Sequence, residues 1–271
     1  MRVKINFLIE KGGRISINYN IFLCAIIYKF LNSANKQFAE FLHNHGFSFN
    51  DSRYFKLFVF SDLICKDITI ENNKLIFNDE KVIWYISSPI DDFIRYLVEG
   101  LFIENSEMLI DMQYFRIDKV EVLAEKQFSK REKFKMLSPM VLSTKKEING
   151  KLRQYYFRYY DDFSQQLLQN LKRKYFLIHK QELKCDYIKF EFDKNYIIRQ
   201  LKKKKEISRL RHIYHWNNKT NSYEDVMVKG ILCPFMIETA EELIKIGYDC
   251  GFGEKNSIGF GMVESVNEKN Y

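Results

Sequence analysis

A cluster of glycines near residue 250 is the feature of this sequence whose spacing most directly suggests ligand chemistry. Five of the eleven glycines lie between Gly247 and Gly261, in the run GYDCGFGEKNSIGFG. Glycine lets a backbone approach a ligand closely and adopt positive φ, so the cluster predicts amide groups that face phosphates. Lys255, Asn256 and Ser257 add polar donors at the tip. The alternative is a tight loop packed against the preceding helix, since no known phosphate-loop pattern fits.

A basic run in the last third of the chain could bind an anion. It consists of Arg199, Lys202, Lys203, Lys204, Lys205, Arg209 and Arg211. The net charge is +8 and aromatic residues make up 16% of the chain. Basic surfaces attract polyanions through counterion release, and aromatic rings can stack on unpaired bases. Together these features favour a nucleic-acid partner, although a charge run is often only a solvated face and most aromatic residues pack in cores.

Metal and cofactor chemistry find no support in the sequence. The five cysteines are scattered, without the paired spacing of a zinc site, and no acidic cluster typical of two-metal nucleases is evident. We therefore expect no metal and no cofactor, so a reaction would depend on side-chain acids, bases and cations. Histidine suits proton transfer near neutral pH, and His43 and His45 lie at the end of one predicted helix.

The elements that would position these residues follow a regular order in the first half. Hydrophobic periodicity predicts strands at residues 2–9, 55–64, 74–86 and 107–112, and helices at 20–31, 35–45 and 89–102. Gly46 is expected to end the second helix. With the first two helices counted as one layer, the order is βαββαβ, which is typical of a ferredoxin-like domain.

The second half gives a similar but less regular pattern. We predict strands at 117–124, 134–143 and 152–157, a helix at 161–179, three or four strands between 184 and 232, a helix from Pro234 to Ile246, and a closing strand at 259–266. The expected fold is α+β with two tandem ferredoxin-like (RRM-like) βαββαβ domains, 1–115 and 116–271. Only three prolines occur and no segment resembles a flexible linker, so the domains should abut.

The N-terminal residues and the apolar runs bear on localisation. Residues 1–10 alternate polar and apolar side chains and lack the apolar block of a signal peptide. The longest apolar run, residues 21–28, is too short to span a bilayer. We expect a cytoplasmic protein without a membrane partner.

The glycine spacing resembles a known signature. Gly251, Gly253, Gly259 and Gly261 form two Gly-x-Gly pairs five residues apart, with Phe252 and Phe260 inside the pairs. This pattern resembles the C-terminal signature of the repeat-associated mysterious protein superfamily, and more narrowly that of the CRISPR repeat-processing endoribonucleases, the Cas-six family. The segments LSPMV (137–141), FKLFVFS (55–61) and INYN (17–20) resemble further family segments in the same order, so the likeness covers essentially the whole chain. Asn18 stands where the family often has proline.

The resemblance implies a reaction and residues for it. Such enzymes cut RNA without metal, by attack of the ribose 2′-OH on the adjacent phosphate, leaving a 2′,3′-cyclic phosphate and a 5′-OH. The positions that match the family's catalytic triad are Tyr28, His43 and Lys56. His43 would be the general base or acid, Lys56 would stabilise the phosphorane, and Tyr28 would position groups or relay a proton. The glycine loop with Lys255, Asn256 and Ser257, and the basic residues 199 and 202–205, would bind RNA.

Other roles for these residues stay open at this point. His45 is the rival of His43, since the two side chains point about 200° apart on a helix and cannot serve one site unless the helix has ended. Tyr28 could equally be a core or hydrogen-bonding residue. Lys56, between apolar strand residues, must reach solvent or a partner.

The expected function is that of a sequence-specific, metal-independent endoribonuclease that binds CRISPR repeat RNA and cuts precursor transcripts into guide RNAs. The main alternative is a non-cleaving RNA-binding member of the same superfamily, and a more distant one is a nucleotide-binding regulator. Besides the repeat RNA, other CRISPR effector subunits and a second copy of the chain remain open as partners.

Overall fold

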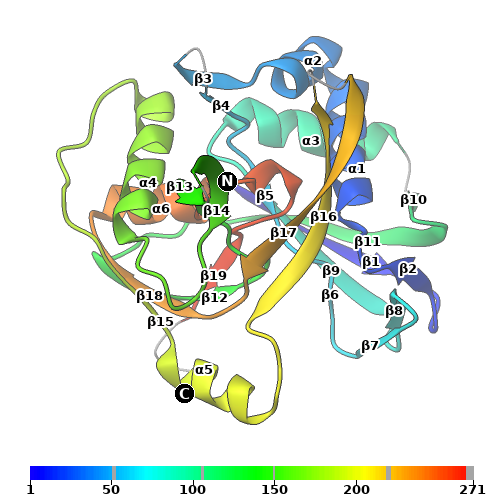
Figure 1. The fold of residues 1–271 in the computed structure, drawn as a ribbon. Coiled ribbons are helices and arrows are strands. Elements are labelled where there is room, and N and C mark those ends of the chain that lie inside the picture. The colour runs from blue at the N-terminus through cyan, green and yellow to red at the C-terminus, as the bar shows by residue number, and fades with distance from the viewer. Residues whose placement is uncertain (51–52, 105–106, 149, 218–220, 267–271) are drawn as a thin grey trace.

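The computed structural model describes residues 1–271 except 51–52, 105–106, 149, 218–220 and 267–271. Its first half is a sheet with the strand order β10-β11-β1-β9-β5, covered by three helices (Figure 1). The main elements, in chain order, are β1 (Arg2–Leu8), α1 (Asn20–Ala34), α2 (Lys36–Asn44), β5 (Val59–Phe60), β9 (Lys81–Ser87), α3 (Asp91–Ile103), β10 (Glu107–Ile110) and β11 (Gln113–Leu123). All pairings in this sheet are antiparallel.

Four of these strands and the helices between them form the ferredoxin-like unit. Taken along the chain as β1, β5, β9 and β11, they lie in the sheet in the order fourth, first, third, second, with β10 added at the edge. Val3, Ile5 and Phe7 of β1 point into the first core, as their alternation predicts. Gly100 of α3 lies so close to α1 that a Cβ there would overlap the carbonyl oxygen of Phe30, which holds the two helices in contact.

The second half repeats this arrangement with insertions. Its sheet has the order β15-β18-β12-β19 and is covered by α4 and α6. The elements are β12 (Arg131–Met136), α4 (Ser164–His179), β15 (Lys189–Phe192), β18 (Phe235–Glu238), α6 (Glu241–Cys250) and β19 (Val263–Ser265). The insertions are the hairpin β13 (Ser143–Ile148) and β14 (Lys151–Tyr156), helix α5 (Lys194–Lys202), and the long hairpin β16 (Ser208–Asn217) and β17 (Ser222–Ile231). The expected pair of ferredoxin-like domains is thereby confirmed.

Smaller elements complete the chain. They are β2 (Arg14–Ser16), β7 (Ile68–Glu71) and β8 (Lys74–Phe77), which form one sheet, the hairpin β3 (Phe47–Asn50) and β4 (Arg53–Phe55), the strand β6 (Ile64–Cys65) on β9, and the short helix η1 (Asn256–Ile258). None of the helices in the described part of the chain is long and apolar enough to cross a membrane.

Several expected elements differ from those observed. The strand expected at 134–143 ends at Met136, the strand expected at 55–64 is divided among β4, β5 and β6, and helix α5 lies in a stretch where we expect only strands. The strand expected at 117–124 to open the second half is instead the end of β11, which pairs with β1 of the first sheet up to Leu123. The single strand expected at 74–86 is broken at Asn78–Glu80 into β8 and β9, because turn-forming residues there carry the chain from one sheet to another. Pro234 precedes a strand rather than a helix: Phe235 and Ile237 alternate into the core, and α6 begins only at Glu241.

The two halves abut, as the lack of a linker predicts. The side chain of Arg2 on β1 crosses into the second half, where its guanidinium donates to the carbonyl oxygens of Tyr248 and Val263, each at 2.9 Å. Arg2 is 3% exposed and stacks over the ring of Tyr248. The expected division near residue 115 stays a prediction; β11 runs through that point and ends at Leu123.

Candidate active site and nucleic-acid interface

Tyr28, His43 and Lys56 lie together at a corner formed by α1, the end of α2 and the residue after β4. The rings of Tyr28 and His43 pack edge to face, with centroids 5.1 Å apart. The ammonium group of Lys56 donates to the carbonyl oxygen of His43 at 2.6 Å and to that of Leu42. Residues separated by 28 positions in the sequence thus form one cluster, whose catalytic role stays a prediction.

Local structure explains how Lys56 reaches this corner. α2 ends at His45, and Gly46 adopts φ +69, as expected of a residue that terminates a helix. The chain then reverses through the hairpin β3–β4. A Cβ at Gly46 would lie 2.7 Å from the carbonyl oxygen of Phe55 and 3.0 Å from Cδ of Lys56. Only glycine therefore permits both the helix end and the close return of Lys56.

Burial at the corner shifts the pKa of each perturbed side chain toward its uncharged form, while the end of α2 attracts a cation. The carbonyl oxygens at the C-terminal end of α2 are unpaired helix acceptors that attract the Lys56 ammonium group. Burial lowers the pKa of Lys56, and nearby Cys24 opposes this shift. Burial raises the pKa of Tyr28, and the proximity of Cys24 adds a smaller shift in the same direction. This phenol therefore keeps its proton at neutral pH. Burial likewise raises the pKa of Cys24 to about 12, which makes it a thiol rather than a nucleophile.

The two neighbouring histidines occupy different environments. His43 is exposed, and its Nδ1 lies 3.0 Å from Oδ1 of Asn44. His45 is the C-cap residue of α2, and its backbone amide donates to the carbonyl oxygen of Phe41 at 2.9 Å. The imidazole that packs against Tyr28 is that of His43. This geometry supports His43 over His45 as the candidate acid or base.

A cleft of about 1100 Å³ between the halves is lined by Lys56 of this corner and by the glycine-rich loop, whereas Tyr28 and His43 are not among its lining residues. Its walls are Lys56 and its neighbours, the hairpin β13–β14, one face of α4 and the loop tip. The charged lining residues comprise six basic side chains and one acidic side chain: Lys56, Lys145, Arg153, Arg173, Lys174, Lys255 and Glu254. A concave surface with this balance attracts a polyanion.

The glycines of the loop are required by packing. Gly251, Gly253, Gly259 and Gly261 are all buried and all have φ between +80 and +90. A Cβ would overlap the carbonyl oxygen of Val141 at Gly253 and that of Phe252 at Gly261. The packing alternative thus accounts for the glycine pattern, while contact of these residues with RNA stays a prediction.

Two buried cations hold the loop from behind. Lys174 of α4 is 1% exposed, and its ammonium group donates to the carbonyl oxygens of Gly251 at 2.6 Å and Gly253 at 2.8 Å and to Oδ1 of Asn256 at 2.8 Å. Burial lowers the pKa of Lys174 to about 8. Arg211 of β16 donates to the carbonyl oxygen of Gly259 and forms an ion pair with Asp62 of the first half.

The three polar residues at the loop tip have different roles. The amide of Asn256 binds inside the loop, since its Nδ2 donates to the carbonyl oxygen of Phe260 at 2.8 Å. Lys255 and Ser257 are half-buried and line the cleft, and burial lowers the pKa of Lys255. The carbonyl oxygen of Ser257 lies 3.4 Å from Sγ of Cys24, so the loop tip contacts the helix that carries Tyr28.

The structure does not bring the basic run to the cleft. Arg199 and Lys202 lie on α5, and Lys203, Lys204 and Lys205 follow it. In Figure 1, α5 lies at the opposite end of the molecule from β4, the strand that precedes Lys56. Arg209 and Arg211 differ from the rest of the run, because both form ion pairs with Asp62. Their role is to fix the β16–β17 hairpin against the first half.

Sequence reasoning missed several residues of the cleft. Lys174 carried a signal: it follows Leu167 by seven residues and Leu171 by three, so a lysine occupies the apolar face of an amphipathic helix. Lys145 and Arg153 gave none, because they lie on an exposed hairpin whose position over the cleft depends on long-range packing. Within the described residues, no three His, Cys, Asp or Glu side chains are grouped as a metal site.

The comparisons with known proteins agree along the whole chain. Residues 14–121 match the family model "CRISPR-associated protein Cas6, N-terminal", and residues 123–265 match "CRISPR associated protein Cas6, C-terminal". The chain is 32% identical over 272 residues to CRISPR-associated endoribonuclease Cas6 1 of Methanocaldococcus jannaschii, covering 100% of this chain and 94% of the relative. The chain belongs to the Cas6 family. The two family matches meet at the end of β11.

Solved structures support the Cas6 fold. A Cas6-related protein from Pyrococcus furiosus superposes with a TM-score of 0.79 at 23% identity, covering 99% of both chains. A CRISPR associated protein Cas6 superposes with a TM-score of 0.72 at 28% identity, covering 98% of this chain and 99% of the other. A Cas6nc protein of Pyrococcus horikoshii, named endoribonuclease-like, is 29% identical over 270 residues, covering 98% of this chain and 100% of the relative. Cas6 relatives thus carry both enzyme and enzyme-like names.

Proposed function

We propose that this chain binds CRISPR repeat RNA in the basic cleft and cuts it at the corner of Tyr28, His43 and Lys56. One observation carries the proposal: an imidazole, a phenol and an ammonium group lie together beside a cleft that six basic residues line against one acidic residue. The naming of family relatives as CRISPR-associated endoribonucleases supports the same substrate class. Because the substrate is a transcript, the proposed site of action is the cytoplasm.

The proposed reaction is an internal transesterification. The ribose 2′-OH attacks the adjacent phosphorus, the bond from phosphorus to the 5′-oxygen breaks, and the products carry a 2′,3′-cyclic phosphate and a 5′-OH. His43 takes the proton of the 2′-OH or supplies one to the leaving oxygen. Lys56 stabilises the negative charge that develops on the phosphorane. Tyr28 keeps its proton and is therefore a hydrogen-bond donor rather than a base.

Lys56 can serve the reaction without leaving its place. An ammonium group has three N–H donors, and the carbonyl oxygens of Leu42 and His43 accept from two of them. The third donor remains for a phosphate oxygen. The same backbone contacts fix the position of the charge beside His43, which is the preorganisation that electrostatic stabilisation of a transition state requires.

A non-cleaving RNA-binding protein is the second candidate. The observation that favours it is the 29% identity to a relative whose name marks it as endoribonuclease-like. Such a protein would use the same cleft and the same loop without the reaction at His43.

The test uses repeat RNA transcribed from an array of the source organism, incubated with the protein in EDTA. Cleavage supports the enzyme, whereas binding without cleavage supports the second candidate. A matched RNA carries one deoxyribose 5′ of the cut. The proposed mechanism predicts complete loss of cleavage but little change in affinity, since one lost hydroxyl among many phosphate contacts costs about 1 kcal/mol. Continued cutting of the deoxy substrate, or a need for a divalent ion, would rule out the mechanism.

A further inference from the structure

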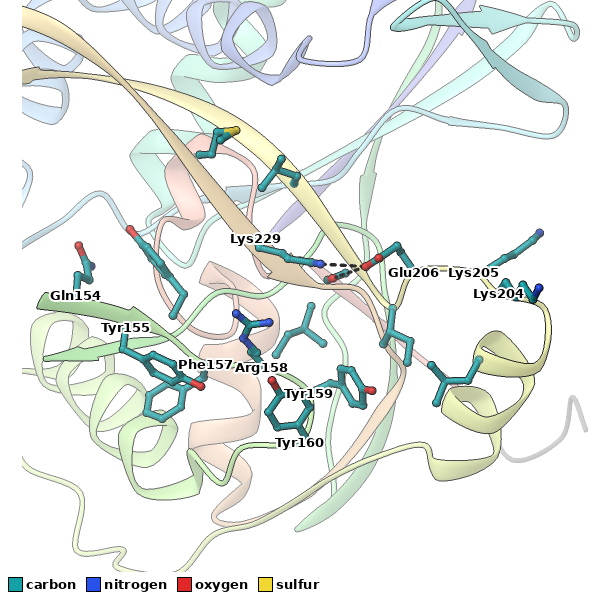
Figure 2. A pocket seen from close by; sticks show the side chains of 17 residues that line it. Gln154, Tyr155, Phe157, Arg158, Tyr159, Tyr160, Lys204, Lys205, Glu206 and Lys229 are labelled. Atoms are coloured by element: carbon teal, nitrogen blue, oxygen red, sulfur yellow. Dashed lines mark hydrogen bonds and ion pairs between the residues drawn. The ribbon is translucent and has the colours of Figure 1, made fainter. Parts of the chain in front are cut away.

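A second hollow, distinct from the cleft, lies between the end of β14, the segment after α5 and the β16–β17 hairpin. Its volume is about 560 Å³. Figure 2 shows Arg158, Tyr159 and Tyr160 on one side of the hollow and Lys204 and Lys205 at its other rim, with Lys229 and Glu206 between them. We call this hollow the tyrosine pocket.

The tyrosine pocket gathers large apolar side chains that remain in solvent. Tyr160 is 65% exposed, Leu201 52%, Leu210 50% and Met227 59%, and all four line it. Single exposed apolar residues are ordinary on a protein surface. Four of them in one concavity form a patch of the kind that binds a ligand or partner.

The charges around this apolar floor are mostly positive. Arg158, Lys204, Lys205 and Lys229 line the pocket against one carboxylate, Glu206. Lys229 is paired with Glu206 at 3.0 Å. Within the described part of the chain, the other three basic residues form no ion pair with a carboxylate. The occupant that this surface fits combines a flat apolar group with negative charge.

The aromatic residues differ in what covers them. The ammonium group of Lys146 lies 3.6 Å from the ring centroid of Tyr155, which occupies one face of that ring. Tyr159 packs near the edge of Tyr160, with centroids 5.1 Å apart at 75°, and leaves the Tyr160 ring largely exposed. Asp161 fixes the turn, because its Oδ2 accepts from the Tyr155 hydroxyl and from the Arg158 amide, each at 2.8 Å. The exposed ring is therefore held on an ordered turn.

We propose that the tyrosine pocket binds an unpaired nucleotide of the RNA, outside the segment that occupies the cleft. The base stacks on Tyr160 over the apolar floor, and its phosphates face Arg158 and the lysines at the rim. Stacking on an aromatic side chain within a basic groove is the general means by which proteins hold single-stranded RNA. The inference rests on the proposed function in taking RNA as the ligand.

The path between the two sites crosses the β13–β14 hairpin. Gln154 lines both the cleft and the tyrosine pocket. Its Nε2 donates to Oγ of Ser143 at 3.1 Å, and Oγ of Ser143 donates to the carboxylate of Glu254 at 2.7 Å. These bonds tie β14, which lies between the two sites, to the glycine-rich loop. Because Gln154 lines both sites, an RNA strand that leaves the cleft beside it would enter the tyrosine pocket.

The test measures the affinity of a single-stranded oligouridylate of about 12 nucleotides, a length within the range that single-strand sites cover. Tyr160→Ala should weaken binding about 5- to 150-fold, the range for loss of one stacked base, and Tyr160→Phe should retain it. Arg158→Ala should reduce the salt slope by about 0.7. The matched controls are Tyr114→Ala, a tyrosine 61% exposed on β11, and Arg14→Ala, an exposed arginine on β2.

The proposal is overturned if Tyr160→Ala and Tyr114→Ala bind the oligouridylate equally well, or if the wild-type protein does not bind it. A 4-thiouridine oligonucleotide should crosslink to residues 158–160, and crosslinks confined to the cleft would also overturn it. Cleavage of repeat RNA by Tyr160→Ala at saturating protein reports separately on the proposed function. If Tyr160→Ala binds oligouridylate more weakly but still cleaves repeat RNA, the tyrosine pocket is supported. If the wild-type protein binds oligouridylate but not repeat RNA, the proposed function is refuted while the pocket is not.

Discussion

Lys56 of the corner and the glycine-rich loop line the same cleft, but the corner of Tyr28, His43 and Lys56 and the loop are built in opposite ways. At the corner, His43 is exposed and its ring contacts only Tyr28 among the described aromatic residues, while Lys56 is held by two backbone carbonyl oxygens. In the loop, every glycine of the signature is buried, and the backbone oxygens bind two buried cations, Lys174 and Arg211.

This difference separates the residues that could react from those that set their surroundings. Removing an exposed side chain changes little in the packing, so a substitution of His43 should affect chemistry far more than stability. Altering the loop disturbs buried backbone groups, whose unsatisfied hydrogen bonds each cost about 1–3 kcal/mol. The loop should therefore lose stability before it loses any specific contact with RNA.

The largest effect is expected at the corner. His43→Ala should slow single-turnover cleavage of repeat RNA by about 10²–10⁴, the usual cost of losing a general acid or base. The free energy of unfolding should change by no more than about 0.5 kcal/mol, because the side chain is exposed. His45→Ala is the matched control. A larger cleavage defect in His45→Ala than in His43→Ala would show that the histidine is misassigned.

The next largest effect is expected on the stability of the glycine-rich loop. Gly253 and Gly12 both have positive φ, at +80 and +85, so alanine at either position costs about 1 kcal/mol in backbone strain. A Cβ at Gly12 meets nothing within 4 Å, whereas at Gly253 it overlaps the oxygen that accepts from the amide of Glu254. Gly253→Ala should therefore lower the free energy of unfolding by about 3 kcal/mol and Gly12→Ala by about 1 kcal/mol, measured by urea denaturation. Equal losses would contradict the packing explanation of the signature.

A smaller effect follows from the lowered pKa of Lys174. Its pKa is about 8 in the folded protein and about 10.4 when unfolded, so between these values the unfolded chain binds more protons. Stability from this group therefore rises with pH across that window. From about pH 7.5 to about pH 9.5, wild type should gain about 2 kcal/mol relative to Lys174→Met. Lys172→Met, on the same helix but paired with Asp186 at the surface, should follow wild type. Parallel curves for wild type and Lys174→Met would contradict the shift.

The smallest expected effect is on the salt dependence of RNA affinity, which allows the cleft to be compared with the basic run. Affinity for RNA falls as salt rises. Neutralising Lys145 and Arg153 by Gln substitution should make the slope of log affinity against log salt less steep by about 1.4, if each contacts one phosphate. The double substitution Lys203→Gln with Lys204→Gln should also make this slope less steep, without altering cleavage in the saturated complex. An unchanged slope in the second pair would identify that part of the run as a solvated face.

Local patterns predicted the elements of this fold better than they predicted the neighbours of each element. The helical stripe of Phe163, Leu167 and Leu171 and the stop at Gly46 are properties of a few adjacent residues, and both were confirmed. The pairing of β11 with β1 joins residues more than a hundred positions apart. Nothing in residues 117–124 indicates which sheet they complete, since both sheets accept the same apolar alternation.

At the candidate site, too, the sequence did not indicate which distant residues lie together. The family resemblance indicated Tyr28, His43 and Lys56, and the structure brings them together, although their roles stay predictions. Lys145 and Arg153 could not be found, because a cation on a two-stranded hairpin becomes a cleft residue only through the placement of the hairpin. Arg211 was grouped with the basic run because its burial against Asp62 and Gly259 is a long-range property.

The side chain of Arg2 has a consequence for how the chain folds during synthesis. Its hydrogen-bond partners, the carbonyl oxygens of Tyr248 and Val263, are translated almost the whole chain length later. At ordinary translation speeds of about 5–20 residues per second, these acceptors are synthesised on the order of ten seconds or more after Arg2. Until then the first half can form its own sheet but cannot complete the interface that defines the cleft. A nascent or truncated chain therefore lacks the complete cleft until β19, which carries Val263, has been translated.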